Sequence, residues 1–143
     1  MALDQWFDGG SLSALRTAVQ AEASDVGMPR YRTSDVVLAV HELAANAVRH
    51  GGGVGRAQLW VAEGALHCMA LHCIVSDAGR GSGDGPARAM ALVAVRPWLF
   101  KPGHGLWLVR GVADQLTADP GPGGSQVTAV FALPSPAASA DDR

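Results

Sequence analysis

Apolar residues between residues 11 and 50 recur every three or four positions, which is the period of an α-helix. The first run predicts a helix from Ser11, a good N-cap, to Gly27. It rests on the spacing of Leu12, Leu15, Val19, Ala23 and Val26. The second run predicts a helix that begins near Thr33 or Ser34 and ends at about His50, ahead of three glycines at 51–53.

After the glycines the period changes to two, the period of a strand. Residues 56–64 and 65–77 are predicted to be neighbouring strands joined by a tight turn at Glu63 and Gly64. Residues 78–104 are rich in glycine and lack a sustained period, which favours a functional lid. Residues 105–116 predict a further helix, 116–134 a hairpin, and 135–143 a disordered tail.

This order predicts one domain, residues 1–134, with the α+β class of fold. We expect a two-layer sandwich in which helices cover one face of a mixed, mostly antiparallel sheet. The length of 143 residues and the 48% hydrophobic content suit a single core. The sequence contains no internal repeat.

Charge and hydropathy exclude several classes of protein. The net charge is -2 and no basic cluster is present, so we expect no direct binding to nucleic acid. No apolar run approaches a membrane span, and the N-terminus lacks the pattern of a secretory signal. Cys68 and Cys73 are predicted in one strand, roughly 16 Å apart, where they could not form a disulfide. A cytoplasmic protein with reduced thiols is expected.

Four short motifs carry candidate chemistry. Glu42 and Asn46 stand four residues apart on the second helix and can reach one object, although such a pair alone is more often a solvated face. Asp77 ends a strand and is followed by Gly79 and Gly81, where a ligand could approach the backbone closely. The other two motifs are Lys101, Gly103, His104, Gly105 and Leu106 at a helix start, which suits an anion, and Gly124 with Ser125 at a strand start.

Taken in order, the motifs read E-x-x-x-N, D-x-G-x-G, G-x-G-L and G-[ST]-x-V. This series resembles the GHKL ATP-binding family, whose fold is also called the Bergerat fold. The stretch "VHELAANAVRHG" is most similar to stand-alone anti-sigma factor serine/threonine kinases and their actinobacterial relatives. The resemblance covers roughly residues 10 to 134 and is specific because four motifs occur together.

The resemblance implies binding of ATP or ADP with Mg²⁺. It implies that Asn46 ligates Mg²⁺, that Glu42 is the general base, and that Asp77 accepts from the adenine amine. Gly79 and Gly81 would lie against the base, Gly103 and Gly105 would flank the phosphates with Lys101, His104 and Leu106 beside them, and Ser125 would fix Asp77. The sequence departs from the family at Ser125, where threonine is usual, and at His41, where a small polar residue is more common.

Two functions follow from the resemblance. In the first, the protein is an anti-sigma factor kinase that binds a sigma factor and phosphorylates an anti-anti-sigma protein of the STAS type. In the second, it is a catalytically weak nucleotide-binding module that acts by binding partners. A homodimer is compatible with the family and with an apolar surface that includes Trp6 and Phe7.

Other classes fit less well. A zinc site made from His67, Cys68, His72 and Cys73 is disfavoured, because strand alternation would separate the ligands on each face. The G-x-S-x-G motif of serine hydrolases is absent, and Trp60, Trp98 and Trp107 have no basic groove beside them. A complete sensor histidine kinase would need a phosphoacceptor histidine, and the roughly 30 residues before the second helix contain none.

Overall fold

Five strands form one antiparallel sheet in the part of the chain that the structure, a computed structural model, describes: residues 2–77, 105–121 and 124–134. The strands are β1 (Leu3–Asp8), β2 (Val54–Glu63), β3 (Met69–Asp77), β4 (Gln115–Gly121) and β5 (Gly124–Ala132). Their order across the sheet is β1-β2-β3-β5-β4, and each neighbouring pair is antiparallel. Because β5 pairs with β3 in the antiparallel direction, the start of β5 lies beside the end of β3.

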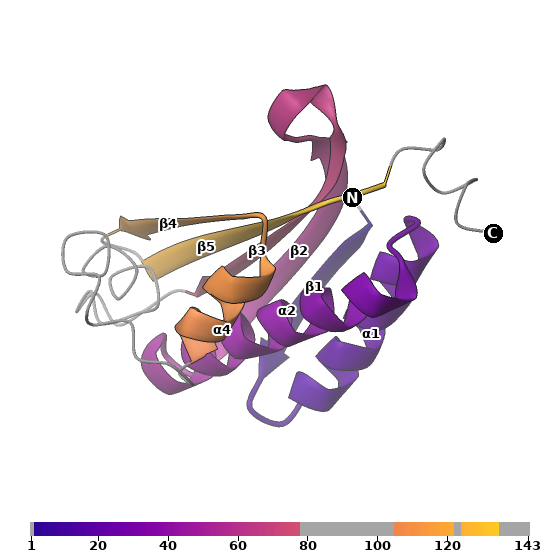
Figure 1. The fold of residues 1–143 in the computed structure, drawn as a ribbon. Coiled ribbons are helices and arrows are strands. Elements are labelled where there is room, and N and C mark those ends of the chain that lie inside the picture. Colours follow the sequence, from indigo (N-terminus) through magenta and orange to yellow (C-terminus); the bar gives the residue numbers. More distant parts are fainter. Residues whose placement is uncertain (1, 78–104, 122–123, 135–143) are drawn as a thin grey trace.

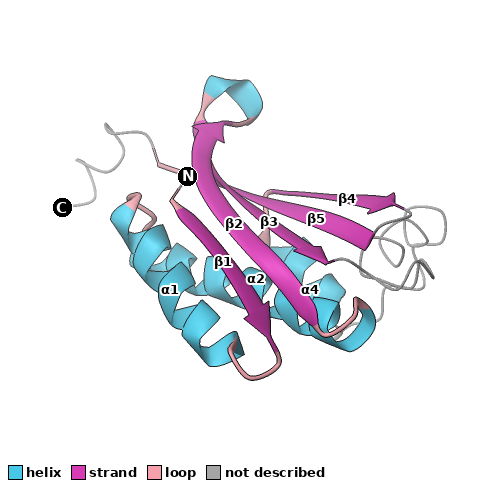
Figure 2. Cartoon of the chain, turned by 180° about the vertical axis from the view of Figure 1, so that it is seen from behind, coloured by secondary structure: helices cyan, strands magenta, loops and turns pink. Residues whose placement is uncertain are grey.

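Helices cover one face of this sheet. They are α1 (Leu12–Asp25), α2 (Arg30–His50) and α4 (Gly105–Val112), and a single 3₁₀ turn, η1 (Ala65–His67), joins β2 to β3. Figures 1 and 2 show α2 in the middle of the helical layer, with α1 on one side and α4 on the other. The predicted α+β two-layer architecture is therefore confirmed.

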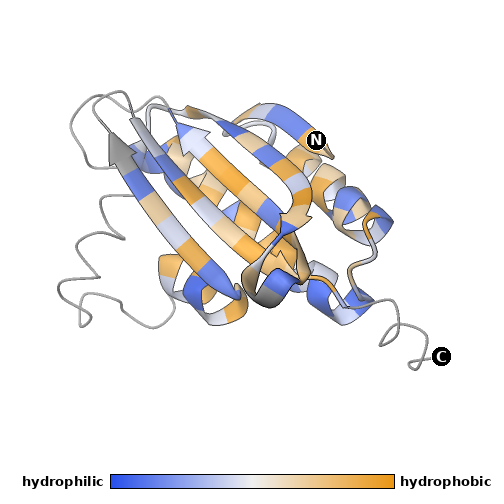
Figure 3. Ribbon diagram, turned by 90° about the horizontal axis from the view of Figure 1, so that it is seen from above, coloured by the Kyte–Doolittle hydropathy of each residue, from blue (hydrophilic) through white to orange (hydrophobic). Residues whose placement is uncertain are grey.

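The core lies between the two layers and follows from the alternation along the strands. In β2, Gly55, Ala57 and Leu59 are buried while the residues between them are half-exposed. Bands of opposite hydropathy along the strands are visible from above (Figure 3). The largest fully buried side chains come from both layers, among them Leu15, Val36, Leu43, Leu71 and Phe131.

The structure adds a strand that the sequence pattern did not predict. β1 is an edge strand paired with β2 through Leu3↔Leu59 to Asp8↔Val54. Its alternation separates the two adjacent aromatic residues, since Phe7 is 3% exposed and Trp6 is 66% exposed. Assigning both to an apolar surface was therefore wrong for Phe7, which is part of the core.

Three boundaries differ from the prediction. Helix α2 begins at Arg30 after Pro29, and the Thr33 hydroxyl donates to the Pro29 carbonyl within the helix at 3.1 Å. The strand expected from residue 65 begins at Met69, because His67 adopts a positive φ of 59° that interrupts extended backbone. The helix expected to reach residue 116 ends at Val112, and Leu116 belongs to β4.

The two cysteines consequently do not share a strand. Cys68 follows η1 and is exposed, whereas Cys73 is buried in β3. The hairpin of β4 and β5 agrees with the prediction. The predicted lid and tail lie outside the described residues. No helix within those residues is long and apolar enough to cross a membrane.

Candidate functional site

Asp77 and Ser125 meet where β3 ends and β5 begins. They are direct partners in the register of these strands, and the Ser125 hydroxyl donates to Asp77 Oδ2 at 2.7 Å. Ser125 is buried and Asp77 is half-buried, so the hydrogen bond between them is partly shielded from bulk water. The strand pairing brings together two residues that are 48 positions apart in the chain.

The second carboxylate oxygen of Asp77 has a different environment. Oδ1 is buried and has no hydrogen-bond partner among the described residues. A buried acceptor without a donor costs about 1–3 kcal/mol, so such groups in folded proteins usually receive a donor from water or a ligand. One oxygen of Asp77 is thus held by the protein and the other is available to a donor such as an exocyclic amine.

Gly51, the C-cap of α2, packs directly against Asp77. A Cβ on Gly51 would overlap the Asp77 side chain and would lie 2.7 Å from its Cβ and from Oδ1. The φ of Gly51 is -110°, which any residue can adopt, so the requirement for glycine here is steric. The sequence pattern indicated a helix stop at residues 51–53, but it did not indicate that Gly51 makes room for Asp77.

Glu42 and Asn46 lie one turn apart on α2 and are both half-buried. The Glu42 carboxylate reaches Gly105, the first residue of α4, so closely that a Cβ on Gly105 would overlap Oε2. The N-terminus of a helix carries partial positive charge, and a carboxylate is favourable beside it. Asn46 Oδ1 accepts a long hydrogen bond of 3.4 Å from Arg49 Nη2. Glu42 therefore faces α4, whereas the contact of Asn46 is with Arg49 on its own helix.

Helix α2 connects these two clusters. Glu42 and Gly51 are nine residues apart, which corresponds to about 13 Å along a helix. The Asp77 pair lies at the C-terminal end of α2, and the start of α4 lies beside its middle (Figure 1). A ligand that touched both clusters would therefore lie along one face of α2.

The structure describes six of the residues predicted for the site. Glu42, Asn46, Asp77, Gly105 and Ser125 belong to the two clusters, whereas Leu106 packs against the hydrophobic core. The remaining predicted residues are outside the described ranges: Gly79, Gly81, Lys101, Gly103 and His104. Within those ranges, no group of three or more His, Cys, Asp or Glu side chains could hold a metal ion.

His41 precedes Glu42 but contacts α1, whereas Glu42 contacts α4. Its Nδ1 lies 3.1 Å from Arg16 Nη1 on α1. Since a guanidinium can only donate, Nδ1 acts as the acceptor in this contact. The departure from the family pattern at His41 therefore lies where α2 faces α1.

Sequence reasoning missed one residue that holds α4 in place. Arg32 on α2 donates to the Val112 carbonyl at the end of α4 at 2.5 Å and to Asp114 Oδ2 at 3.1 Å. It also bonds Asp35 at 2.7 Å and lies over the Phe131 ring, 5.1 Å from its centroid. These partners are 80 or more residues away except for Asp35, so no local spacing could have revealed the contact.

The chain resembles one known protein family and two solved structures. Residues 6–131 match the family described as "Histidine kinase-like ATPase domain". The fold is similar to the structure of the RsbU and RsbW domains of Rv1364c from Mycobacterium tuberculosis, with a TM-score of 0.57, 18% identity, and coverage of 93% of this chain. A histidine kinase domain of the blue-light activated kinase from Erythrobacter litoralis EL346 aligns with a TM-score of 0.48 and 18% identity, over 85% of this chain.

The chain spans 34% of the mycobacterial structure and 61% of the Erythrobacter structure. No curated protein matches it. The family match extends over nearly all of the described sheet and helices and includes both clusters of the site. This chain therefore belongs to the histidine kinase-like ATPase family, the GHKL family that its four motifs resemble.

Proposed function

We propose that this protein binds ATP with Mg²⁺ and is an anti-sigma factor serine/threonine kinase. In this proposal it binds a sigma factor and phosphorylates an anti-anti-sigma protein of the STAS type. The observation that carries nucleotide binding is the Asp77 carboxylate, with one oxygen fixed by Ser125 and the other buried without a described donor. The family resemblance of the Glu42 motif supports the kinase activity and its partners.

Asp77 provides the adenine end of the proposed site. Its Oδ1 accepts from the exocyclic amine of adenine, while the Ser125 hydroxyl keeps the carboxylate from rotating. Gly51 lets the carboxylate pack against the end of α2. Guanine carries a carbonyl oxygen where adenine carries its amine, so this arrangement would disfavour GTP.

Glu42 and Asn46 provide the phosphate end. The amide oxygen of Asn46 is a hard ligand of the kind Mg²⁺ prefers, and Mg²⁺ commonly uses few protein ligands together with substrate phosphates. Bound ATP with Mg²⁺ supplies the transferable phosphoryl group and the charge that stabilises its transfer. Glu42 accepts the proton of the attacking serine or threonine hydroxyl.

Isothermal titration calorimetry with ATP, ADP and GTP tests the nucleotide site. We expect micromolar binding of the adenine nucleotides and at least about tenfold weaker binding in Asp77→Asn, which loses a charge-assisted hydrogen bond. Asp119→Asn on β4 is the matched control and should bind like wild type. The absence of ATP and ADP binding in the folded wild-type protein would rule out the assignment.

Phosphotransfer from radiolabelled ATP to candidate STAS-type proteins tests the kinase activity. Glu42→Gln should retain nucleotide affinity and lose transfer by about a hundredfold or more, because the general base is removed. Glu22→Gln on α1 serves as the control. If wild type and Glu42→Gln both bind ATP and transfer equally little, the protein is the weak regulatory module instead of a kinase.

A further inference from the structure

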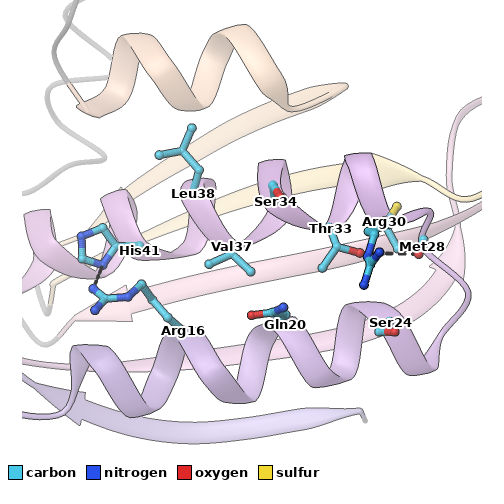
Figure 4. A pocket seen from close by; sticks show the side chains of 10 residues that line it. All are labelled: Arg16, Gln20, Ser24, Met28, Arg30, Thr33, Ser34, Val37, Leu38 and His41. Atoms are coloured by element: carbon cyan, nitrogen blue, oxygen red, sulfur yellow. Dashed lines mark hydrogen bonds between the residues drawn. The ribbon is translucent and has the colours of Figure 1, made fainter.

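A groove runs between α1 and α2 on the side of the helical layer away from α4 (Figure 4). It is an open hollow of about 770 Å³. Its rim consists of exposed side chains that repeat every four residues along α1, namely Arg16, Gln20 and Ser24, with Arg30 and Ser34 on α2. The half-buried Val37 extends from α2 toward α1 and gives the groove an apolar side chain, while Leu38 lines it from the side of α2 that faces α4 (Figure 4).

The two helices run antiparallel, so both ends of the groove carry an arginine. Arg16 and His41 meet at one end, and Arg30 lies at the other end beside Ser24 and Met28 (Figure 4). From Arg30 to His41 is about 16 Å along α2, the length of roughly five residues of extended chain. The groove therefore has the length of a short extended peptide.

The positive charges of Arg16 and Arg30 in this groove are not balanced by acidic side chains in its lining. None of the described residues that line it is an aspartate or a glutamate. Asp35, the acidic residue of α2 that follows Ser34, is held by Arg32 at 2.7 Å and does not line the groove. Arg16 contacts a ring nitrogen of His41, which is not a carboxylate. An incoming carboxylate would thus find donors at both ends and amide or hydroxyl groups between them.

The residues that line the groove favour an acidic peptide over a nucleic acid. Nucleic acid binding usually adds aromatic side chains for base stacking and a strongly basic surface. The groove has no aromatic side chain other than His41 among the residues described, and the whole chain has a net charge of -2. An acidic peptide with apolar residues between its carboxylates matches the arginines at the ends and the apolar side chains of Val37 and Leu38 in the lining.

We propose that the α1/α2 groove binds an acidic, extended segment of a protein partner. Arg16 and Arg30 pair with carboxylates four or five residues apart in that segment. The groove's Arg16 end lies beside the turn of α2 that carries Glu42, so a partner docked there would be near the nucleotide site. The biological meaning of this docking rests on the proposed partner-regulated function, but peptide binding itself requires no nucleotide.

The test is an ¹⁵N–¹H NMR titration of the full chain, without nucleotide, with hexaglutamate as the probe. Hexaglutamine is the neutral control and hexathymidylate the nucleic-acid control. We expect hexaglutamate to shift amide signals of α1 and of the first half of α2, with saturation. The double variant Arg16→Ala/Arg30→Ala should bind at least about fivefold more weakly, and Arg110→Ala on α4 should bind like wild type.

Each other outcome overturns the proposal. It is wrong if hexaglutamate leaves the groove signals unchanged, if hexaglutamine shifts them equally, or if Arg110→Ala weakens binding as much as the groove variant. Stronger binding of hexathymidylate in the groove would assign it to nucleic acid instead. Arg16→Lys/Arg30→Lys keeps the charges and should retain most of the affinity. If the double alanine variant does not fold, the single variant Arg30→Ala takes its place and should also bind hexaglutamate more weakly than wild type. Failure of ATP binding would leave this result unaffected.

Discussion

Gly51 has no functional group, yet the position of the Asp77 carboxylate depends on it. Replacing Gly51 by alanine places a methyl group within the space of the Asp77 side chain, close to the strand backbone where little can move. We expect Gly51→Ala to destabilise the fold by about 1–3 kcal/mol. It should also weaken ATP binding about tenfold, because Asp77 is displaced, and calorimetry with urea unfolding measures both effects.

Gly111 provides the matched control for this substitution. It lies in α4, and a methyl group at this position would have nothing within 4 Å. Gly111→Ala should therefore leave ATP affinity unchanged and should stabilise the helix by up to about 1 kcal/mol. If a folded Gly51→Ala protein binds ATP as tightly as wild type, then the close approach of Gly51 to Asp77 is not needed for binding.

The two thiols should differ sharply in reactivity. Burial raises the pKa of the Cys73 thiol to about 12 from an ordinary value of 9.0, whereas Cys68 is exposed. At pH 8 the disulfide reagent DTNB should therefore label one thiol rapidly and the second only after unfolding. Cys68→Ser should abolish the rapid phase. Rapid labelling of two thiols in the native protein would contradict the burial of Cys73.

The same raised pKa sets a direction for alkaline stability. The unfolded chain releases the Cys73 proton near pH 9, while the folded chain keeps it until about pH 12. The contribution of Cys73 to stability is therefore complete below pH 9 and is lost as the pH rises from 9 to 12. Urea unfolding at pH 8 and pH 10.5, compared with Cys73→Ala, measures this change.

At the scale of elements, Arg32 fixes how α4 sits on α2. It joins the α2 start to the Val112 carbonyl and to Asp114, which also accepts from the Ala132 amide at 2.7 Å. We expect Arg32→Met to destabilise the protein by about 2–3 kcal/mol, since the Val112 carbonyl loses its side-chain donor and Asp35 and Asp114 lose their charged partner. Hydrogen exchange should speed up most in α4, and ATP affinity should fall because Gly105 is the other end of the same helix.

Arg110→Met is the control for Arg32→Met, since Arg110 is exposed near the end of the same helix. It should change stability by less than about 0.5 kcal/mol. Uniform acceleration of exchange in every helix of Arg32→Met would indicate a general loss of stability and would contradict a specific role in holding α4.

The elements predicted from sequence were those with long, regular periods. The two long helices and the β4–β5 hairpin have clear apolar spacing and are bounded by glycines, so all of them were predicted. β1 was missed because it has only six residues and contains two adjacent aromatic residues, which obscure the alternation of apolar and polar positions. Only its pairing with β2 shows that one of these side chains is buried and the other is exposed. The strand boundary at Met69 was missed because histidine indicates a positive φ only weakly, so the residue type of His67 did not predict the break.

Short sequence motifs predicted which residues belong to the site, but not which of them contact one another. Glu42, Asn46, Asp77, Gly105 and Ser125 were named from four short motifs. The structure adds that Asp77 contacts Ser125 and that Glu42 contacts Gly105. Those meetings depend on strand register and helix packing, which link residues 48 to 63 positions apart. Gly51 and Arg32 could not be identified for the same reason, because their partners lie on other elements.

For the whole molecule, the N-terminal strand completes both the sheet and the core. Phe7 inserts its ring against Gly55 of β2, so closely that a Cβ there would overlap it, while Trp6 points to the open face beneath the guanidinium of Arg56. Arg56 also pairs with Asp4 on β1, and this hydrogen bond lowers the pKa of the Asp4 carboxyl. β1 is thus attached on both faces of the sheet, although only the Phe7 side reaches the core.

Two neighbouring substitutions separate these faces. Phe7→Ala should cost about 3–5 kcal/mol, a large fraction of the roughly 5–15 kcal/mol typical of a domain, because it leaves a cavity between β1, β2 and the helices. Trp6→Ala should cost less than about 1 kcal/mol, since the ring is 66% exposed. Urea unfolding measures both, and equal losses would mean that the register of β1 on β2 is shifted by one residue, since such a shift exchanges the two faces.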